Sequence, residues 1–366
     1  MRTTLMSATR LRRCLRAFRG ATKVLILTHD YPDPDAVASA LALQRLIERR
    51  LHCEVDIAYG GIVGRAENRA LVKAVRANLK PLEDVDWDSY EACALVDTQP
   101  RTGNNSLPFG RVPDVVIDHH PLRPQTRRVK FHDVRTRYGA TATMLYEYLK
   151  AARFRMDPDL ATALFYAIQA ETQTLSREAS RRDREAYVSL FPYVDFRKIS
   201  EIEYAGVSRA YFSKMGSALS GTTLYGDLAI ISLGEVAHPE LCAEFCDMIL
   251  RLESVRWALC IGHKSGTMVL SLRTKERTGR AGVIIARVVG KEGKAGGHGM
   301  MAGGIARLER FDPPVYESAC ATLAARFLEA MDATDRIPEN LLNSSDLDVA
   351  ENRPESRIEK ETGTSS

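Results

Sequence analysis

The chain has 366 residues, of which 45% are hydrophobic and 7% aromatic, so it can bury ordinary hydrophobic cores, and its length suggests about two domains. Its 51 basic residues nearly balance its 47 acidic ones, and a formal charge of +4 excludes the overall basic surface of a general nucleic-acid binder. No apolar stretch approaches the roughly 20 residues that cross a bilayer, so we expect no membrane partner.

The first twenty residues contain six arginines and no acidic residue, a composition that superficially resembles a transit peptide. Leu11, Leu15 and Phe18 nevertheless have the spacing of one helical face, and Gly20 follows where a helix would end. We therefore predict a first helix of the folded domain, with an organelle-targeting signal as the alternative.

From residue 23 to about residue 131, β-branched apolar runs alternate with helical patterns, which is typical of a parallel α/β sheet. The expected strands are residues 23–28, 53–58, 92–97, 114–118 and 128–132. Helices are expected at residues 36–50, 65–79, 140–152, 158–170 and 181–190, where apolar residues recur three and four apart. The predicted fold class is α/β, with a parallel sheet covered by helices on both faces.

The pattern becomes mixed and charged over residues 191–219, which fits an inter-domain connection that includes a helix. A second, smaller α/β unit should follow, with strands at 223–233, 257–263 and 267–274, a helix at 239–252, then the segment 281–290 and a glycine-rich loop. Aromatic residues vanish after Ala333, which predicts a disordered tail. We therefore expect a domain over residues 1–195, a helical linker over 196–215, a second domain over 216–333 and a tail over 334–366.

The seven cysteines are scattered singly, apart from one Cys-x3-Cys pair at helical spacing. This pattern predicts reduced core thiols in a cytoplasmic protein, in preference to a disulfide framework or a zinc site.

A first acidic cluster follows the strand expected at residues 23–28. His29 precedes Asp33 and Asp35, and the prolines at 32 and 34 are expected to hold this segment extended, so that both carboxylates point the same way. Two close carboxylates repel each other unless a cation neutralises them, and a divalent metal does so most directly. The alternative is an acidic turn that caps the helix starting at Ala36.

Two further clusters follow later strands. Asp97 follows the apolar strand ALV and, taken alone, is better explained as a helix or turn cap. The strand DVVI is followed directly by Asp118, His119 and His120. The two imidazoles offer a neutral nitrogen ligand and an acid or hydrogen-bond donor to a phosphate, and the carboxylate can orient either ring. Because the carboxyl ends of parallel strands meet at one edge of the sheet, we expect these side chains to converge. Glu171 ends a strongly apolar helix and must reach solvent or a cation.

A glycine-rich segment near the end of the chain places His298 after Gly296 and Gly297, where the backbone can approach a ligand closely. It is preceded by Ser271 and Arg273, and an arginine at a strand end could bind phosphate bidentately. The alternative for this basic region is a solvated strand and helix face.

Together these motifs resemble the DHH phosphoesterases, in particular the branch with a DHH-associated C-terminal domain that includes nanoRNase/pAp phosphatases, bifunctional oligoribonucleases and PAP phosphatases. The resemblance covers roughly residues 10 to 330. It includes the metal motifs around His29, Asp97 and Asp118, a fourth motif at Glu171, and the S-x-R and GGH elements of the second domain.

The resemblance implies two divalent ions, with manganese expected and magnesium or cobalt as alternatives. One ion would bind His29, Asp33 and Asp97, and the other would bind Asp35, Asp97, His119 and Glu171. His120 would face the phosphate with support from Asp118, whereas Ser271, Arg273, Gly296, Gly297 and His298 would hold the substrate's terminal phosphate and nucleotide. The active site would lie in the cleft between the two domains, where a two-metal-activated hydroxide would attack phosphorus.

The resemblance implies that the substrates are short RNA or DNA oligonucleotides, linear dinucleotides or 3'-phosphoadenosine 5'-phosphate. It is compatible with either a monomer or a homodimer. The chain departs from the family pattern at Glu171, where aspartate is usual, at Gln173, where glycine is usual, and at Met300 and Met301 in the glycine segment. The alternatives are an inorganic polyphosphate or pyrophosphate hydrolase and a non-catalytic nucleotide-binding regulator.

Overall fold

The computed structural model describes residues 2–308, 310 and 312–342, and it divides the chain into two compact units, Met1–Gly206 and Val207–Ser366. This division falls inside the segment expected as a linker. Among the described residues, none of the helices combines the length and apolar character that crossing a bilayer requires.

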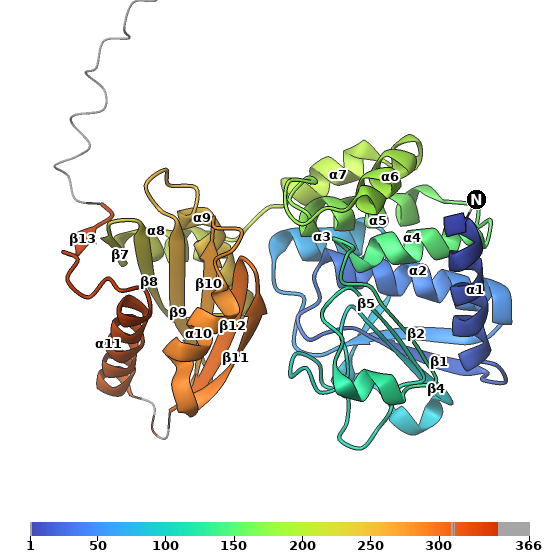
Figure 1. The fold of residues 1–366 in the computed structure, drawn as a ribbon, viewed down its shortest axis with the longest axis horizontal. Coiled ribbons are helices and arrows are strands. Elements are labelled where there is room, and N and C mark those ends of the chain that lie inside the picture. Colours follow the sequence, from blue (N-terminus) through green and yellow to red (C-terminus); the bar gives the residue numbers. More distant parts are fainter. Residues whose placement is uncertain (1, 309, 311, 343–366) are drawn as a thin grey trace, which may run out of the picture. The chain divides into compact units, whose positions relative to one another are not determined.

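The first unit is built on a parallel six-stranded sheet in the order β3-β2-β1-β4-β5-β6 (Figure 1). Its strands are β1 (Lys23–Leu27), β2 (Glu54–Tyr59), β3 (Leu79–Pro81), β4 (Ala92–Val96), β5 (Val115–Asp118) and β6 (Phe131–Val134). The predicted α/β class with a parallel sheet is confirmed. The short edge strand β3 was not predicted, and β6 begins three residues later than expected because a 3₁₀ helix occupies Pro124–Arg128.

The α-helices of this unit cover one face of the sheet, and 3₁₀ helices and loops cover the other. The helices are α1 (Arg2–Ala17), α2 (Pro34–Leu51), α3 (Ala66–Ala74), α4 (Thr141–Ala151), α5 (Pro158–Glu171), α6 (Arg181–Leu190) and α7 (Phe196–Glu203). Val24 and Ile26 of β1 belong to the core under the helices, whereas Leu25 and Leu27 face residues of loops and 3₁₀ helices. The crossover from β3 to β4 is too short for an α-helix and forms two 3₁₀ turns instead.

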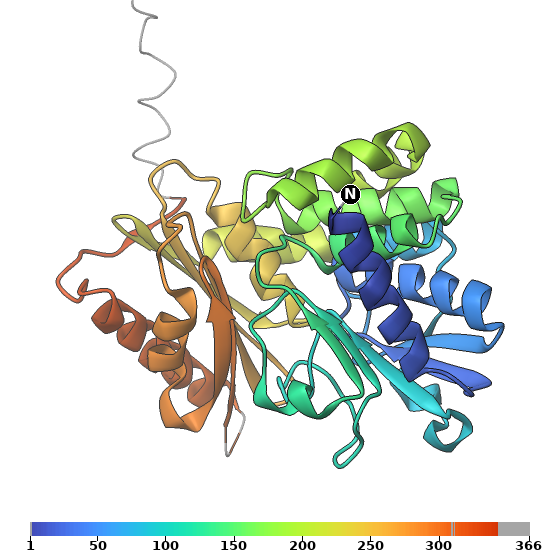
Figure 2. The same ribbon diagram turned by 45° about the vertical axis from the view of Figure 1, so that its right-hand side comes forward.

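The first helix packs as a core element, as its spacing predicted. Leu11 and Phe18 are buried with the central helices, and α1 lies beside α4 and β6 (Figure 2). Gly20 has a φ of 92°, a conformation that favours glycine, and the chain turns there into β1.

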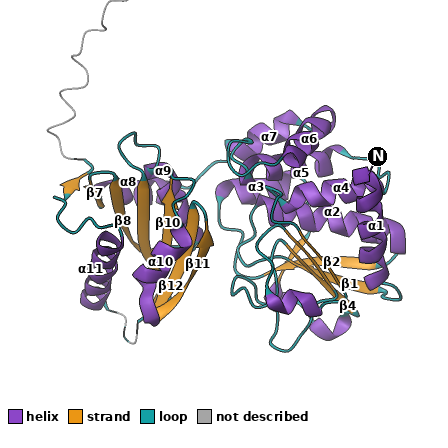
Figure 3. Ribbon diagram, in the orientation of Figure 1, coloured by secondary structure: helices purple, strands orange, loops and turns teal. Residues whose placement is uncertain are grey.

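The second unit contains a mixed seven-stranded sheet in the order β11-β12-β10-β9-β8-β7-β13, with helices on both faces (Figure 3). Its strands are β7 (Thr222–Tyr225), β8 (Leu228–Glu235), β9 (Trp257–Lys264), β10 (Thr267–Thr274), β11 (Gly293–His298), β12 (Met301–Arg307) and β13 (Glu339–Asn340). Helices α8 (Arg209–Ser220) and α9 (Glu240–Ile249) pack on one face, and α10 (Ala281–Val289) and α11 (Pro313–Ala330) pack on the other.

Three expectations for this unit need correction. The single strand expected at 223–233 is a hairpin, because Gly226 adopts a φ of 65° and reverses the chain. The expected glycine-rich loop forms two paired strands, β11 and β12. Residues 339–340, inside the segment expected to be disordered, pair with β7, and residues 343–366 of that segment lie outside the described residues. All seven cysteines are free, as predicted, and six of them are buried.

Candidate active site

The strand order of the first unit reverses between β1 and β4, which is where open parallel sheets bind ligands. His29 follows β1 after one residue, Asp97 follows β4 directly, and Asp118 is the last residue of β5. The predicted convergence of these three segments at the carboxyl edge is therefore confirmed.

His29 lies between two carboxylates. Its Nδ1 atom is 2.9 Å from the carbonyl oxygen of Asp30. Its Nε2 atom is 3.6 Å from Oδ1 of Asp33 and 3.7 Å from Oδ2 of Asp97. Burial lowers the pKa of His29, but the charge and hydrogen bond of Asp33 and the charge of Asp97 outweigh it and raise this pKa to about 10. Without a bound cation, a proton on His29 thus compensates the carboxylates.

Asp33 caps the N-terminus of α2, which agrees with the alternative interpretation of this segment as an acidic turn that caps a helix. Its Oδ1 atom accepts a hydrogen bond from the backbone N–H of Ala36 at 2.9 Å, at the N-terminus of α2. The expectation that the prolines keep this segment extended is wrong beyond Asp33. Helix α2 begins at Pro34, because proline is tolerated at the first helical position, and Asp35 lies in the first turn.

Asp35 is buried between the N-termini of two helices. Its Oδ2 atom accepts the backbone N–H of Thr141 at 2.7 Å, and Oδ1 accepts that of Ala142 at 2.7 Å. Both donors begin α4, so the dipoles of α2 and α4 favour a negative charge at this point. Burial and the charge of Asp97 nevertheless raise the pKa of Asp35 well above its ordinary value.

Asp97 occupies the centre of the cluster. It adopts a left-handed φ of 59° directly after β4, and its backbone N–H bonds to the carbonyl of Ile117 at 2.9 Å. Such a conformation costs about 1–2 kcal/mol for a non-glycine residue and recurs at functional sites. The residue is 2% exposed, and burial followed by the charge of Asp33 raises its pKa to about 8.

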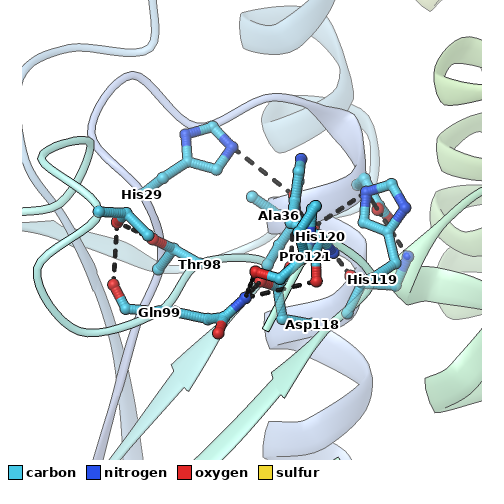
Figure 4. Close-up of polar contacts among 12 residues, drawn as sticks. His29, Ala36, Thr98, Gln99, Asp118, His119, His120 and Pro121 are labelled. Atoms are coloured by element: carbon cyan, nitrogen blue, oxygen red, sulfur yellow. Dashed lines mark hydrogen bonds and ion pairs between the residues drawn. The ribbon is translucent and has the colours of Figure 1, made fainter. Parts of the chain in front are cut away.

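The two histidines after β5 are held in different ways (Figure 4). His119 has Nδ1 at 3.2 Å from the carbonyl oxygen of Tyr138, and its Nε2 atom is 3.6 Å from Oδ1 of Asp97 and 3.9 Å from Oδ2 of Asp35. That Nε2 atom is buried and has no hydrogen-bond partner among the described residues. His119 therefore directs an unsatisfied nitrogen at two carboxylates.

His120 is oriented by Asp118. Its Nδ1 atom lies 2.8 Å from Oδ1 of Asp118, whose other oxygen accepts a hydrogen bond from Nε2 of Gln99 at 2.6 Å. Burial lowers the pKa of His120, but the hydrogen bond and charge of Asp118 outweigh it and raise this pKa to about 10. Figure 4 shows the Gln99 amide directed at Asp118 and at the backbone of His120 and Pro121.

The side chains form two overlapping sets that could each hold a metal ion. Two sets of potential ligand atoms each lie within 4.8 Å of one another: His29 with Asp33 and Asp97, and Asp97 with His119 and His120. Among the described residues, the ion-pair partners of Asp97 are all histidines, so the structure supplies no lysine or arginine to neutralise it. The orphaned Nε2 of His119 and the raised pKa of the buried carboxylates are what hard divalent cations would relieve.

Glu171 is the last residue of α5 and belongs to neither set of ligand atoms. Its charge nevertheless raises the pKa of both Asp35 and His120, so it acts on the cluster. Its assignment as a metal ligand remains a prediction.

The predicted phosphate-binding residues of the second unit lie in adjoining strands. Strand register places Arg273 opposite Met301, which is itself opposite His298, and places Ser271 opposite Gly303, which is opposite Gly296. Gly297 has a φ of 154°, and a side chain there would collide with Ala302. The Arg273 guanidinium is already engaged: Nη1 donates to the carbonyls of Leu272 and Ala302 at 3.1 Å, and Nε is 3.5 Å from Oδ1 of Asp247.

Sequence reasoning missed three residues that build the site. The Oγ1 atom of Thr141 donates to Oδ1 of Asp97 at 2.8 Å, and Gln99 braces Asp118. Asp183 is fully buried and accepts hydrogen bonds from the backbone N–H of Gly139 at 2.8 Å and the Thr143 hydroxyl at 2.6 Å, which fixes the entry into α4. Of these three residues, only Gln99 could have been suspected from the sequence, because it stands two residues after Asp97.

Carboxylates and imidazoles that converge at the switch point of a parallel sheet define a class of α/β domain suited to binding cations at its strand ends. Residues 23–168 match the family described as the DHH family, N-terminal domain. The first unit therefore contains a DHH-family N-terminal domain.

Two similar proteins extend this comparison. The chain is 35% identical over 278 residues to the uncharacterized protein MJ1633 of Methanocaldococcus jannaschii, a match that covers 75% of this chain and 56% of that protein. The chain thus spans about half the length of this curated relative. The structure of an exopolyphosphatase-related protein from Bacteroides fragilis matches with a TM-score of 0.69 and 15% identity, covering 90% of this chain and 98% of that one, which shows a shared fold.

Proposed function

We propose that this protein is a divalent-metal-dependent phosphohydrolase that cleaves phosphoester bonds in short oligonucleotides, linear dinucleotides or 3'-phosphoadenosine 5'-phosphate. The observation that carries the proposal is the position of Asp97 between two sets of ligands. Its Oδ2 atom faces His29 at 3.7 Å, and its Oδ1 atom faces His119 at 3.6 Å. One carboxylate can therefore contribute to two cation sites, as paired-metal phosphoesterases require.

In this proposal, His29, Asp33 and Asp97 hold one cation, and Asp35, Asp97, His119 and Glu171 hold the other. Two such cations, which we propose to be manganese, would supply water activation and positive charge for the phosphate oxygens. Thr141 and Ala142 hold Asp35 in place through their backbone amides, so this carboxylate is oriented before any ligand arrives.

His120 serves as a proton donor to a phosphate oxygen. Asp118 lies within hydrogen-bond distance of its Nδ1 atom and thereby fixes the orientation of the ring. A positioned imidazolium stabilises the charge that develops during phosphoryl transfer, where positioning and electrostatics supply most of the catalysis.

Ser271, Arg273, Gly296, Gly297 and His298 are proposed to bind the terminal phosphate and nucleotide. Arg273 would exchange its hydrogen bonds to the carbonyls of Leu272 and Ala302 for hydrogen bonds to two phosphate oxygens. A guanidinium binds a charged phosphate more strongly than it binds a neutral carbonyl. The free, mostly buried cysteines support a cytoplasmic location.

The proposal is tested by incubating the purified protein with pApA and manganese. We expect release of mononucleotides, a rise in melting temperature on adding manganese, and loss of both effects in Asp97→Ala. Asp88→Ala is the matched control, because the Asp88 side chain is 97% exposed and lies outside the cluster.

The outcomes separate the alternatives. Equal turnover by Asp97→Ala would refute the metal assignment. A preference for pyrophosphate over pApA would favour the inorganic polyphosphate or pyrophosphate hydrolase. Tight nucleotide binding without hydrolysis under any divalent ion would favour the non-catalytic regulator.

A further inference from the structure

The first unit contains a second pocket, of about 410 Å³, which the metal cluster does not use. Its walls come from three helices and one turn: Glu67 of α3, Tyr166 and Gln169 of α5, Gln173 of the turn after α5, and Glu203 of α7. The volume is in the range of small-molecule sites. Its lining of carboxylates, amides and one phenol is suited to hydrogen bonding.

Tyr166 is the residue that points to a ligand. It is only 7% exposed and lines the pocket, and among the described residues its hydroxyl has no hydrogen-bond partner. Glu67 and Glu203 line the same pocket, and burial and their charges raise the pKa of this phenol although the charge of Arg65 lowers it. The hydroxyl oxygen is not itself among the buried unpaired polar atoms of the described residues, so this donor is accessible to a molecule bound in the pocket.

The carboxylates of the pocket are themselves oriented. Glu203 accepts a hydrogen bond from Nε2 of Gln169, whose Oε1 atom accepts one from the Tyr187 hydroxyl at 3.0 Å. Arg65 lies beside Glu67, with Nη1 at 3.7 Å from Oε1. The pocket therefore offers oriented acceptors together with the Tyr166 hydroxyl as a donor.

Two links connect the pocket to the metal cluster. On α3, Asn68 follows Glu67 and donates from Nδ2 to the carbonyl of Pro32 at 3.3 Å, within the segment that carries Asp33 and Asp35. On α5, the pocket residue Ala170 precedes Glu171, whose charge acts on the cluster. These links join the walls of the pocket to the segments that carry Asp33, Asp35 and Glu171.

A turn of unusual conformation completes the wall. Gln173, Thr174 and Leu175 have consecutive positive φ values of 46°, 53° and 66°, and the backbone N–H of Thr174 bonds to the carbonyl of Gln169 at 2.8 Å. This hydrogen bond fixes the turn against α5 and presents the side chains of Gln173 and Thr174 to the pocket.

We propose, on the basis of the function proposed above, that this pocket binds a nucleobase of the substrate and prefers guanine. The carboxylates of Glu67 and Glu203 repel phosphate and accept N–H donors. Guanine presents two adjacent donors, N1–H and the N2 amino group, beside the O6 acceptor, which the Tyr166 hydroxyl can serve. Adenine presents an unprotonated N1 at the equivalent position, which a carboxylate repels.

The test is calorimetric titration of the wild-type protein with GMP and with AMP, which share the same phosphate and differ in the base. We expect GMP to bind roughly tenfold more tightly, and Tyr166→Phe to weaken GMP binding roughly tenfold with little effect on AMP. The control is Tyr193→Phe, the same change at a tyrosine that is 54% exposed and outside the pocket. Glu67→Gln is a second variant that removes an acceptor and should also reduce the preference.

Equal affinity of the wild-type protein for GMP and AMP would overturn the inference, as would unchanged GMP affinity in both variants. Hydrolysis of pApA and pGpG is measured in parallel. If neither is hydrolysed while the base preference and its loss are observed, the proposed function fails and the pocket assignment stands. If both are hydrolysed at equal rates by the wild-type protein and Tyr166→Phe, the pocket assignment fails and the function stands.

Discussion

The Oδ1 atom of Asp118 lies 2.8 Å from Nδ1 of His120 and 3.2 Å from the backbone N–H of the same residue. One carboxylate oxygen thus fixes both the backbone and the ring of the histidine two residues away. The other oxygen is held by Gln99, so Asp118 cannot rotate without losing a hydrogen bond on each side.

Asp118→Asn should lower kcat about 10–100-fold with little change in KM. An asparagine cannot offer an acceptor oxygen to both His120 and Gln99, so the imidazole loses its orientation while the substrate pocket is retained. Steady-state kinetics with pApA measures this, and Asp114→Asn, at the other end of β5, is the control because it bonds the Cys93 amide away from the cluster. A rise in KM alone would contradict the positioning role.

Asp183→Ala should destabilise the protein by about 3 kcal/mol, because it leaves several buried donors without an acceptor. These include the backbone N–H of Gly139, the Thr143 hydroxyl and the backbone N–H of Ser180. Urea denaturation of the metal-free protein gives the free energy of unfolding. Asp183→Asn keeps one acceptor oxygen and should lose less, so equal losses in the two variants would show that the carboxylate is not needed as an acceptor.

Gln173→Gly should stabilise the protein by about 0.5–1 kcal/mol. Gln173 has a φ of 46°, and glycine adopts this conformation without the clash that a Cβ atom causes. Thermal unfolding measures the gain, and Gln173→Ala is the control because alanine keeps the Cβ atom. If glycine and alanine have the same melting temperature, the turn is not strained at this position.

The stability of the metal-free protein should fall as the pH rises from about 5 to about 8.5. The pKa of Asp97 is about 8 in the folded protein and about 4 in an unfolded chain, so the folded state keeps a proton that the unfolded state releases over this range. His29 and His120 act in the same direction, because their pKa values of about 10 exceed the unfolded value of about 6.5.

Manganese should reverse this trend, because the bound cation takes the place of the protons on these side chains. At high pH, fewer protons compete with the cation for the same ligands. The increase in melting temperature on adding manganese should therefore be larger at pH 8.5 than at pH 5.5. Melting curves in EDTA and in manganese at both pH values measure it. Asp97→Asn should flatten the pH dependence in EDTA, and an unaltered slope in that variant would assign the effect to other groups.

The alternation of β-branched runs and helical patterns determined most of the first unit from sequence alone. Strands β1, β2, β4 and β5 lie where they were predicted. In β1, β4 and β5 nearly every residue is apolar because both faces of these strands are buried, whereas β2 alternates between buried and less buried residues. The motif residues follow these strands directly, so their convergence at one edge required only that the sheet be parallel. Asp97 and His119 could be named on this basis without coordinates.

Only the tertiary structure decided how these side chains are held. Asp35 is bound by the amides of Thr141 and Ala142, more than a hundred residues further along the chain, and backbone amides carry no side-chain signature. Whether a helix N-terminus meets a carboxylate depends on how α4 docks against α2, which is set by packing across the whole core. The same holds for Tyr166. Its apolar neighbours in the sequence indicate a core residue, whereas the arrangement of α3, α5 and α7 forms a pocket that Tyr166 lines.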